Sequence, residues 1–286
     1  MAERDPVSGK NTTGHEWDGI KELNSPLPRW WVIVFYLTVA WAVGYWIAYP
    51  SWPTLHTYAK GVLGYTSRGE VAQDIAKAKL AQAGWMAKLK TATVEQINTN
   101  PELREYAMAG GAVAFRENCA PCHQQGGAGA YGFPRLAADR WIWGGALAQI
   151  QTTITHGSRW AADPETHRMD MPRFGDDKVL NEDQISKVAD YVVALYKAPD
   201  TANTLPGKAI FAEHCVACHG EKGVGNTEVG APSLKTAVWL YSGTKEGIMA
   251  QVHSPKMGVM PAWGAKLDEA VIKELTVYVH SLGGGR

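Results

Sequence analysis

Cys119-Ala120-Pro121-Cys122-His123 and Cys215-Val216-Ala217-Cys218-His219 are two copies of one five-residue pattern, around which the rest of the chain is arranged. Cys-x-x-Cys-His is the attachment signal of c-type haem: the sulfurs form thioethers with the porphyrin and the histidine binds the iron. A zinc site made of two Cys-x-x-Cys pairs and a redox dithiol are the competing interpretations, but neither explains the histidine after each pair. The sequence therefore predicts two covalently bound haems, held by Cys119, Cys122, His123, Cys215, Cys218 and His219.

A Met-Pro pair follows each attachment motif, at Met171-Pro172 and at Met260-Pro261. A methionine thioether as the sixth iron ligand suits electron transfer and raises the reduction potential, and the proline restricts the adjoining backbone. We therefore expect Met171 and Met260 to complete the coordination of the two irons. Whether each methionine binds the haem of its own half or of the other half stays open. A crossed arrangement would need intertwined domains.

Other side chains near the Met-Pro pairs could compete for the irons. Met169 and Met257 lie close to the two pairs but are not followed by proline, so we expect them not to be ligands. Bis-histidine ligation is the alternative, although most histidines in loops are solvated. The histidines that could supply it are His156, His167 and His253.

The two motifs belong to an internal repeat. Gly111-x-x-x-Phe115 precedes the first motif, and Gly207-x-x-x-Phe211 precedes the second at the same spacing. Each half ends in a helix-like stretch, residues 183–196 and 268–282, on whose aromatic side chain the phenylalanine is expected to pack, while the glycine permits a close helix crossing. Further matches pair Pro134 with Pro232, Leu136 with Leu234, Trp141 with Trp239, and Ile150 with Ile248. The sequence predicts two small, mainly α-helical domains, residues 106–198 and 199–286.

The two halves differ most at residues 159–168, which lengthen the ligand loop of the first half. This insertion is a candidate docking surface or haem-propionate contact. A solvated loop is an equally good interpretation of it.

Composition limits the function classes. The formal net charge is zero, so no broad basic field points to nucleic acid. The four cysteines are all used by the two motifs, which leaves none for disulfides. Thioether attachment of haem indicates an extracytoplasmic compartment in bacteria, where the thiols must first be kept reduced.

Residues 30–49 contain no charged side chain and are followed by Pro50. At about 1.5 Å per residue they span roughly 30 Å, the thickness of the bilayer hydrocarbon, and tryptophans and tyrosines at both ends suit the membrane interfaces. We expect a polar tail (1–29) and one uncleaved transmembrane helix (30–50). Flanking basic residues barely favour a cytoplasmic N-terminus, but the haem motifs require the remainder to be periplasmic.

A linker, residues 51–105, separates the transmembrane helix from the first haem domain and holds no ligand candidate. Apolar residues recur in it at spacings of three and four, which predicts an amphipathic helix over residues 69–90. Its apolar stripe needs a surface, either the haem domains, a partner subunit or the membrane; packing within the protein is the simplest expectation. Asn100-Pro101 is typical of the start of the next helix. The stripe consists of Val71, Ile75, Ala78, Ala81, Trp85 and Leu89.

The chain resembles a known family over nearly its whole length. Residues 14–31, Gly-His-Glu-Trp-Asp-Gly-Ile-Lys-Glu-Leu-Asn-Ser-Pro-Leu-Pro-Arg-Trp-Trp, are the specific part, supported by Trp52-Pro53 and by residues 64–68. Together with one membrane helix and two tandem class I cytochrome c domains, they resemble the dihaem FixP or CcoP subunit of cbb3-type cytochrome c oxidases. In class I cytochromes c, a proline carbonyl at the position of Pro134 and Pro232 accepts a hydrogen bond from the proximal histidine.

The resemblance implies an electron relay in a respiratory chain that drives proton transport and oxidative phosphorylation. A donor cytochrome c or the bc1 complex would supply the electrons, which would pass to a monohaem cytochrome c subunit and then to the haem-copper subunit that reduces oxygen. With both irons six-coordinate, we expect no catalytic residue in this chain. The rival hypotheses are a free-standing, membrane-tethered dihaem carrier and a dihaem peroxidase.

Overall fold

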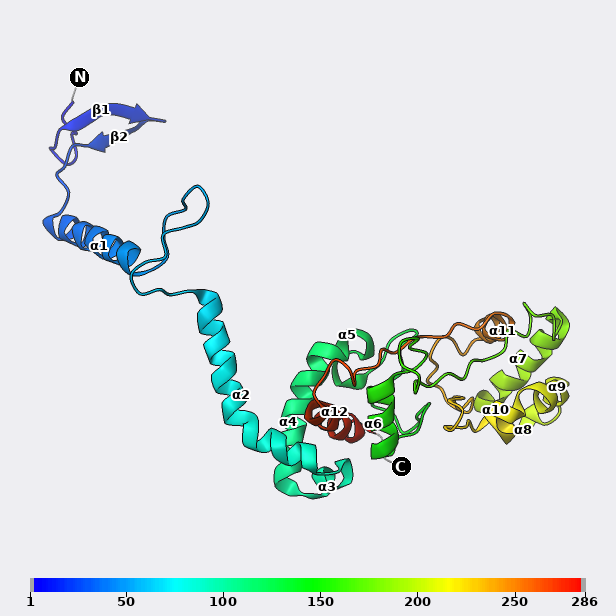
Figure 1. The fold of residues 1–286 in the computed structure, drawn as a ribbon. Helices are drawn as coiled ribbons and strands as arrows, with labels where there is room; N and C mark the ends of the chain where they lie inside the picture. The colour runs from blue at the N-terminus through cyan, green and yellow to red at the C-terminus, as the bar shows by residue number, and fades with distance from the viewer. Residues whose placement is uncertain (1–2, 284–286) are drawn as a thin grey trace. The chain divides into compact units, whose positions relative to one another are not determined.

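A computed structural model of the chain describes residues 3–283, in two compact units that divide between Ala81 and Gln82. Figure 1 shows the elements along the chain. They are β1 (Thr12–Trp17), β2 (Ile20–Leu23), α1 (Arg29–Ala48), α2 (Ser67–Thr91), α3 (Val94–Thr99), α4 (Pro101–Asn118), α5 (Ala120–His123), η1 (Gln125–Gly127), α6 (Leu147–His156), α7 (Glu182–Lys197), α8 (Pro199–Ala202), α9 (Gly207–His214), α10 (Val216–His219), η2 (Glu221–Gly223), α11 (Lys245–His253) and α12 (Glu269–Ser281).

The first unit begins with a hairpin, in the segment for which the sequence predicts only a polar tail. Strands β1 and β2 pair antiparallel, and Trp17 lies opposite Ile20. Between them, Asp18 and Gly19 both have positive φ, 47° and 84°. Asp-Gly is the dipeptide that favours such two-residue turns, because both positions tolerate positive φ at little cost. This signal was present in the sequence.

Helix α1 matches the predicted transmembrane segment. Arg29–Ala48 form one 20-residue helix with a mean hydropathy of 1.7. None of its residues is buried, so its apolar surface faces outward all round. A soluble helix would bury one stripe instead. Its length and composition make α1 a candidate membrane span.

Helix α2 forms where the apolar periodicity predicted it, but its stripe is packed only at one end. Val71 and Ile75 are exposed, whereas Leu89 is fully buried. In the last turns the ring of Trp85 stacks on Tyr106 of α4 at 5.2 Å between centroids. Packing against the following helices is therefore confirmed for the C-terminal turns alone.

A buried lysine fixes the end of α2. Lys273 of α12 is 6% exposed and its Nζ donates to the carbonyls of Leu89, Lys90 and Ala92, at 3.2, 2.7 and 3.0 Å. The last carbonyls of a helix have no partner inside the helix, so the ammonium satisfies them and interacts favourably with the helix dipole. The contact joins the last turn of α2 to the last helix of the chain.

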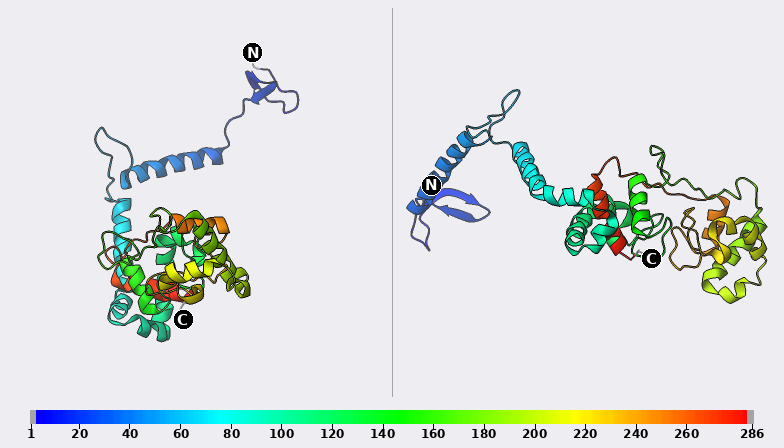
Figure 2. Two further views of the ribbon diagram at one scale, coloured as in Figure 1. Left: turned by 90° about the vertical axis from the view of Figure 1, so that its right-hand side faces the viewer. Right: turned by 60° about the horizontal axis from the view of Figure 1, so that its bottom comes forward.

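The second unit contains two helical bundles, and the chain runs through them in an unexpected order. Helix α12 packs against α4 and α6, while α7 packs against α9 and α11. Figures 1 and 2 show the last helix, in red, beside α4, and α7 beside α9. We call the group of α4, α5, α6 and α12 the split bundle, because it is assembled from two distant segments. The group of α7, α8, α9, α10 and α11 is the continuous bundle.

These bundles do not follow the expected domain boundaries. We expected residues 106–198 and 199–286 to pack as successive domains, each closed by its own last helix. Instead the closing helix of each half packs on the attachment helix of the other half, so residues 182–253 form one bundle nested within the other. Each half of the repeat supplies the same set of helices, so the motif spacing alone fits both arrangements.

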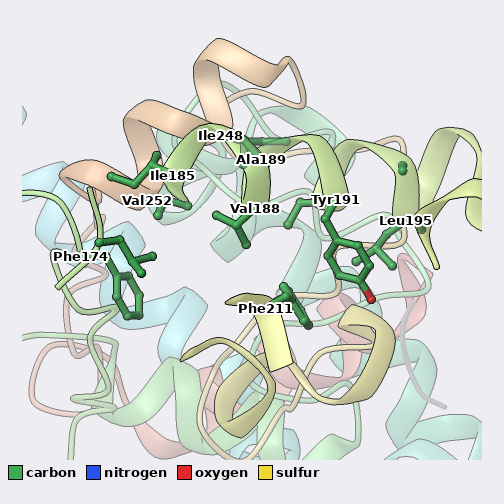
Figure 3. Packing of buried hydrophobic residues seen from close by; sticks show 13 residues of the cluster. Phe174, Ile185, Val188, Ala189, Tyr191, Leu195, Phe211, Ile248 and Val252 are labelled. Atoms are coloured by element: carbon green, nitrogen blue, oxygen red, sulfur yellow. The ribbon is translucent and has the colours of Figure 1, made fainter. Parts of the chain in front are cut away.

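The two bundles have separate apolar cores. The core of the continuous bundle, shown in Figure 3, places Phe211 of α9 against Tyr191 of α7, with ring centroids 5.1 Å apart. The split bundle repeats this contact between Phe115 of α4 and Tyr278 of α12, at 5.3 Å. The predicted phenylalanine-to-aromatic contacts therefore exist, with the partner helices exchanged. Besides Tyr191 and Phe211, the core in Figure 3 includes Phe174, Ile185, Val188, Ala189, Leu195, Ile248 and Val252.

Candidate haem sites

Each Cys-x-x-Cys-His motif forms a single helical turn directly after its attachment helix. In the split bundle the carbonyl of Cys119 accepts from the amides of Cys122 and His123, at 3.1 and 2.8 Å. The carbonyl of Cys215 does the same in the continuous bundle, accepting from Cys218 at 3.3 Å and from His219 at 2.9 Å. Residues three and four apart share one face of a helix, so each turn gathers two thiols and one imidazole on one side.

A backbone carbonyl orients each motif histidine. Nδ1 of His123 lies 3.0 Å from the carbonyl oxygen of Pro134, and Nδ1 of His219 lies 3.0 Å from that of Pro232. A carbonyl can only accept, so Nδ1 carries the proton and Nε2 keeps its lone pair for a metal. Burial lowers the pKa of both histidines, which favours the neutral imidazole that ligation requires. The predicted proline contacts are confirmed.

The surroundings of the thiols argue against both competing chemistries, a redox dithiol and a shared zinc site. Burial raises the pKa of Cys119 to about 11 and that of Cys215 to about 12. Redox dithiols need a lowered thiol pKa, because the thiolate is the attacking species. The two pairs also pack on different cores, Cys119 in the split bundle and Cys215 in the continuous bundle. A single zinc site shared by both pairs would require them to meet.

The structure places each Met-Pro methionine with the attachment motif of the other half. Met171 packs on the core of the continuous bundle and borders a cavity that is also lined by Cys215, Cys218 and His219. Met260 packs on the core of the split bundle, which contains Cys119. The sequence left this choice open, and the packing favours the crossed arrangement.

Both Met-Pro segments are held against the C-terminal end of a helix from the opposite half. The amides of Gly175 and Asp176, just after Met171-Pro172, each donate to the carbonyl of His253 at 3.2 Å. In the split bundle the amide of Trp263 donates to Ile154 at 3.1 Å. The C-terminal carbonyls of α11 and α6 lack partners inside their helices, so docking the Met-Pro segments there satisfies both.

The alternative ligands are exposed or engaged elsewhere. Met169 and Met257 border the cavity of the continuous bundle, but they are 48% and 38% exposed. His156 contacts Asp163 and Glu165, both at 3.1 Å. His167 stacks on Trp143 with 4.1 Å between centroids, and His253 lies 3.3 Å from Asp176. The three histidines thus have partners outside the two sites.

Two indole nitrogens indicate which group the sites accept. Nε1 of Trp141 and Nε1 of Trp239 are buried and have no hydrogen-bond partner among the described residues. Buried donors are rarely left without an acceptor, and the propionates of a haem are acceptors of the required kind. Trp141 and Trp239 occupy matching positions of the repeat, so the sequence contains a signal for this shared role. The residues present therefore fit haem at both sites.

The chain matches two known protein families. Residues 9–56 match the family described as the N-terminal domain of the cbb3 cytochrome oxidase subunit FixP. Residues 107–192 and 202–279 match, in tandem, the family described as cytochrome c oxidase, cbb3-type, subunit III.

Curated relatives match over almost the full length. A FixP subunit of a cbb3-type cytochrome c oxidase from Sinorhizobium medicae is 52% identical, over 98% of this chain and 97% of its own. One from Azorhizobium caulinodans is 52% identical, over 99% and 96%. The CcoP subunit of Azospirillum brasilense is 48% identical, over 99% of both chains. Cytochrome c domains imply haem c, and the chain belongs to the FixP/CcoP family, subunit III of the cbb3-type cytochrome c oxidases.

Proposed function

We propose that the protein is the membrane-anchored dihaem electron-transfer subunit of a cbb3-type oxidase. One haem c is attached at Cys119 and Cys122, and the other at Cys215 and Cys218. Electrons enter from a donor cytochrome c or the bc1 complex and leave toward the monohaem cytochrome c subunit and the haem-copper subunit. The observation that carries the proposal is the pairing, in each bundle, of a motif histidine held by a proline carbonyl with a methionine from the other half.

His123 and Met260 would hold the iron of the first haem, and His219 and Met171 would hold that of the second. When bound, each haem supplies a one-electron iron couple. The chain's own residues set its properties: the bond from Nδ1 to the proline carbonyl increases the basicity of the histidine, while the thioether and the apolar core raise the potential. Because each site would hold its iron with a histidine and a methionine, neither would leave a position for oxygen or peroxide to bind. The chain therefore transfers electrons and leaves oxygen reduction to the haem-copper subunit.

The membrane topology follows from the chemistry of attachment. Helix α1 crosses the bacterial inner membrane once, with the hairpin of β1 and β2 on the cytoplasmic side and both bundles in the periplasm. The family match at residues 9–56 includes the hairpin and α1. A bare tether needs only an apolar run with basic flanks, so we assign this segment to docking on the integral subunits of the oxidase.

The test of ligation uses single-haem proteins. With Cys215 and Cys218 replaced by alanine, only the first haem remains. Met260→Leu should then abolish the near-infrared band of methionine-ligated ferric haem, and Met171→Leu should leave it. With Cys119 and Cys122 replaced, the dependence should reverse. Met169→Leu and Met257→Leu are matched controls and should have no effect in either background. A band that depends on the methionine of its own half would contradict crossed ligation.

The test of the relay uses the assembled oxidase. A chain ending near Tyr65 keeps the hairpin and α1 but lacks both bundles. It should co-purify with the haem-copper subunit in mild detergent and fail to oxidise cytochrome c. Conversely, an unrelated membrane anchor in place of residues 1–49 should weaken assembly and leave both haem spectra intact. Normal assembly and respiration with the foreign anchor would favour a free-standing tethered carrier.

A further inference from the structure

The segments that carry the two methionine ligands meet at one dipeptide, Ser158-Arg159. The backbone of Ser158 pairs with that of Met260 in both directions: the amide of Ser158 donates to Met260 at 3.0 Å, and the amide of Met260 donates back at 2.9 Å. Ser158 is buried, at 5% exposure. The next residue, Arg159, therefore directly follows an isolated antiparallel bridge to Met260, the methionine proposed as a ligand of the first haem.

The guanidinium of Arg159 joins the two ligand segments. Its Nε donates to the carbonyl of Gly258 at 2.7 Å, two residues before Met260. Its Nη1 donates to the carbonyl of Met169 at 3.2 Å, two residues before Met171. One rigid fork of donors thus contacts the backbone just before each of the two methionines. An arginine fork fixes the relative direction of its donors in a way that the single ammonium of a lysine does not.

The backbone of Arg159 is strained in a way that maintains this geometry. Its φ is +55°, in the left-handed region that is unfavourable for a residue with a Cβ. The amide of Arg159 donates to the carbonyl of His167 at 2.7 Å, which secures the turn. A strained residue that the surrounding hydrogen bonds hold in place is a marker of a functional constraint.

The charge of Arg159 is not neutralised by an ion pair within residues 3–283. Arg173, close to the same methionine, lies 3.7 Å from Asp176 and 2.9 Å from Asp177. Arg159 has no carboxylate within 4 Å in that part of the chain, and it borders the cavity that contains Met171 and His219. Its donors are directed at backbone carbonyls, which makes positioning, and not charge pairing, its chemistry.

We propose that Arg159 is a positioning residue for both distal methionines, so that one side chain couples the ligation of the two haem irons. The inference rests on the crossed ligation proposed above. It assigns a role to the insertion at residues 159–168, and it predicts that a defect at Arg159 reaches both haems together. A contact that held only one loop would affect one haem alone.

The experiment measures how readily each methionine leaves its iron. Imidazole binding to the ferric protein is followed by stopped flow in the full-length chain, and in the two single-haem backgrounds to assign the rates. Arg159→Lys and Arg159→Gln should both speed imidazole binding about tenfold at each haem, equivalent to about 1.4 kcal/mol. Covalent haem content should be unchanged. Arg168→Gln is the matched control, because Arg168 lies in the same insertion and its guanidinium donates to the carbonyl of Asp163 within that insertion, at 3.0 Å. Its rates should stay at the wild-type value.

The outcomes separate this proposal from the one on which it rests. Acceleration at one haem only, at neither haem, or in Arg159→Gln but not in Arg159→Lys would overturn the coupling role. Loss of the methionine band from the first haem in Met260→Leu, and from the second haem in Met171→Leu, would still support the proposed ligation. If those variants keep the band, crossed ligation fails whatever the Arg159 variants do.

Discussion

Glu274 is the most perturbed carboxyl group of the chain among the residues described. It lies on α12, is 5% exposed, and faces Gly110 of α4, where an added Cβ would come within 2.6 Å of the carboxyl carbon. Burial, with a smaller contribution from the charge of Asp268, raises the pKa of Glu274 from 4.5 to about 7. The sequence did not indicate this, because a glutamate within an amphipathic helix is normally solvated. It is buried because α12 packs on the other half of the repeat.

The first prediction concerns the pH dependence of stability. Because the folded-state pKa of Glu274 is above the unfolded one, the protonated form favours folding, and stability falls as pH rises from about 4.5 to about 7. The loss levels off above the folded pKa, at roughly 3 kcal/mol. Glu274→Gln should remove this component, so that the variant is more stable than the wild type at pH 8. The measurement is urea unfolding of the split bundle at several pH values, followed through the first haem.

Glu246→Gln is the control for this experiment, because Glu246 lies in the first turn of α11 and is exposed. It should leave the pH profile of unfolding as in the wild type. An unchanged profile in Glu274→Gln as well would show that the carboxyl is solvated in the folded protein.

At the scale of elements, two glycines permit the helix crossings on which the bundles depend. A Cβ at Gly111 of α4 would lie 2.7 Å from Cβ of Tyr278, and one at Gly207 would lie 2.9 Å from Cα of Val188. The sequence predicted both close crossings correctly from the shared Gly-x-x-x-Phe pattern. It could not predict which helix crosses which, because both closing helices carry a tyrosine in the corresponding place, Tyr191 and Tyr278.

The second prediction uses these glycines. Gly111→Ala should destabilise the split bundle and Gly207→Ala the continuous bundle, each by about 1–3 kcal/mol, since an extra methyl group forces tightly packed helices apart. Gly84→Ala is the matched control: Gly84 is also helical but has nothing within 4 Å of its Cβ position. Alanine there should be neutral or should stabilise by up to about 1 kcal/mol. Denaturant titration followed separately at the two haems distinguishes the bundles.

At the scale of the whole molecule, the chain leaves the split bundle after α6, builds the continuous bundle, and returns to complete the first with α12. The repeat, both attachment motifs, both Met-Pro pairs and helix α1 could be predicted, because each has a local pattern in the sequence. The order of assembly could not, because it depends on which of two equivalent closing helices reaches each core.

The third prediction distinguishes the nested order from successive domains. A chain that ends at Lys256 lacks Met260 and α12 but keeps Met171, α7, α9 and α11. In the nested arrangement the second haem should keep its methionine band and its potential, while the first becomes high-spin or takes another ligand. Domains at residues 106–198 and 199–286 predict the reverse. Ferric spectra of the truncated protein in the two single-haem backgrounds decide between them.

The order of helices also sets the order in which a newly made chain can acquire its structure. Every part of the continuous bundle is available once residue 254 has been synthesised, whereas the split bundle waits for the last twenty or so residues, so the site that is encoded first is completed last. Until then α4 exposes the apolar surface meant for α12, and closing so long a loop slows folding. Proteins that bind unfolded chains should therefore be needed most by the half nearest the membrane helix in sequence, and premature termination near the C-terminus should damage that distant half first.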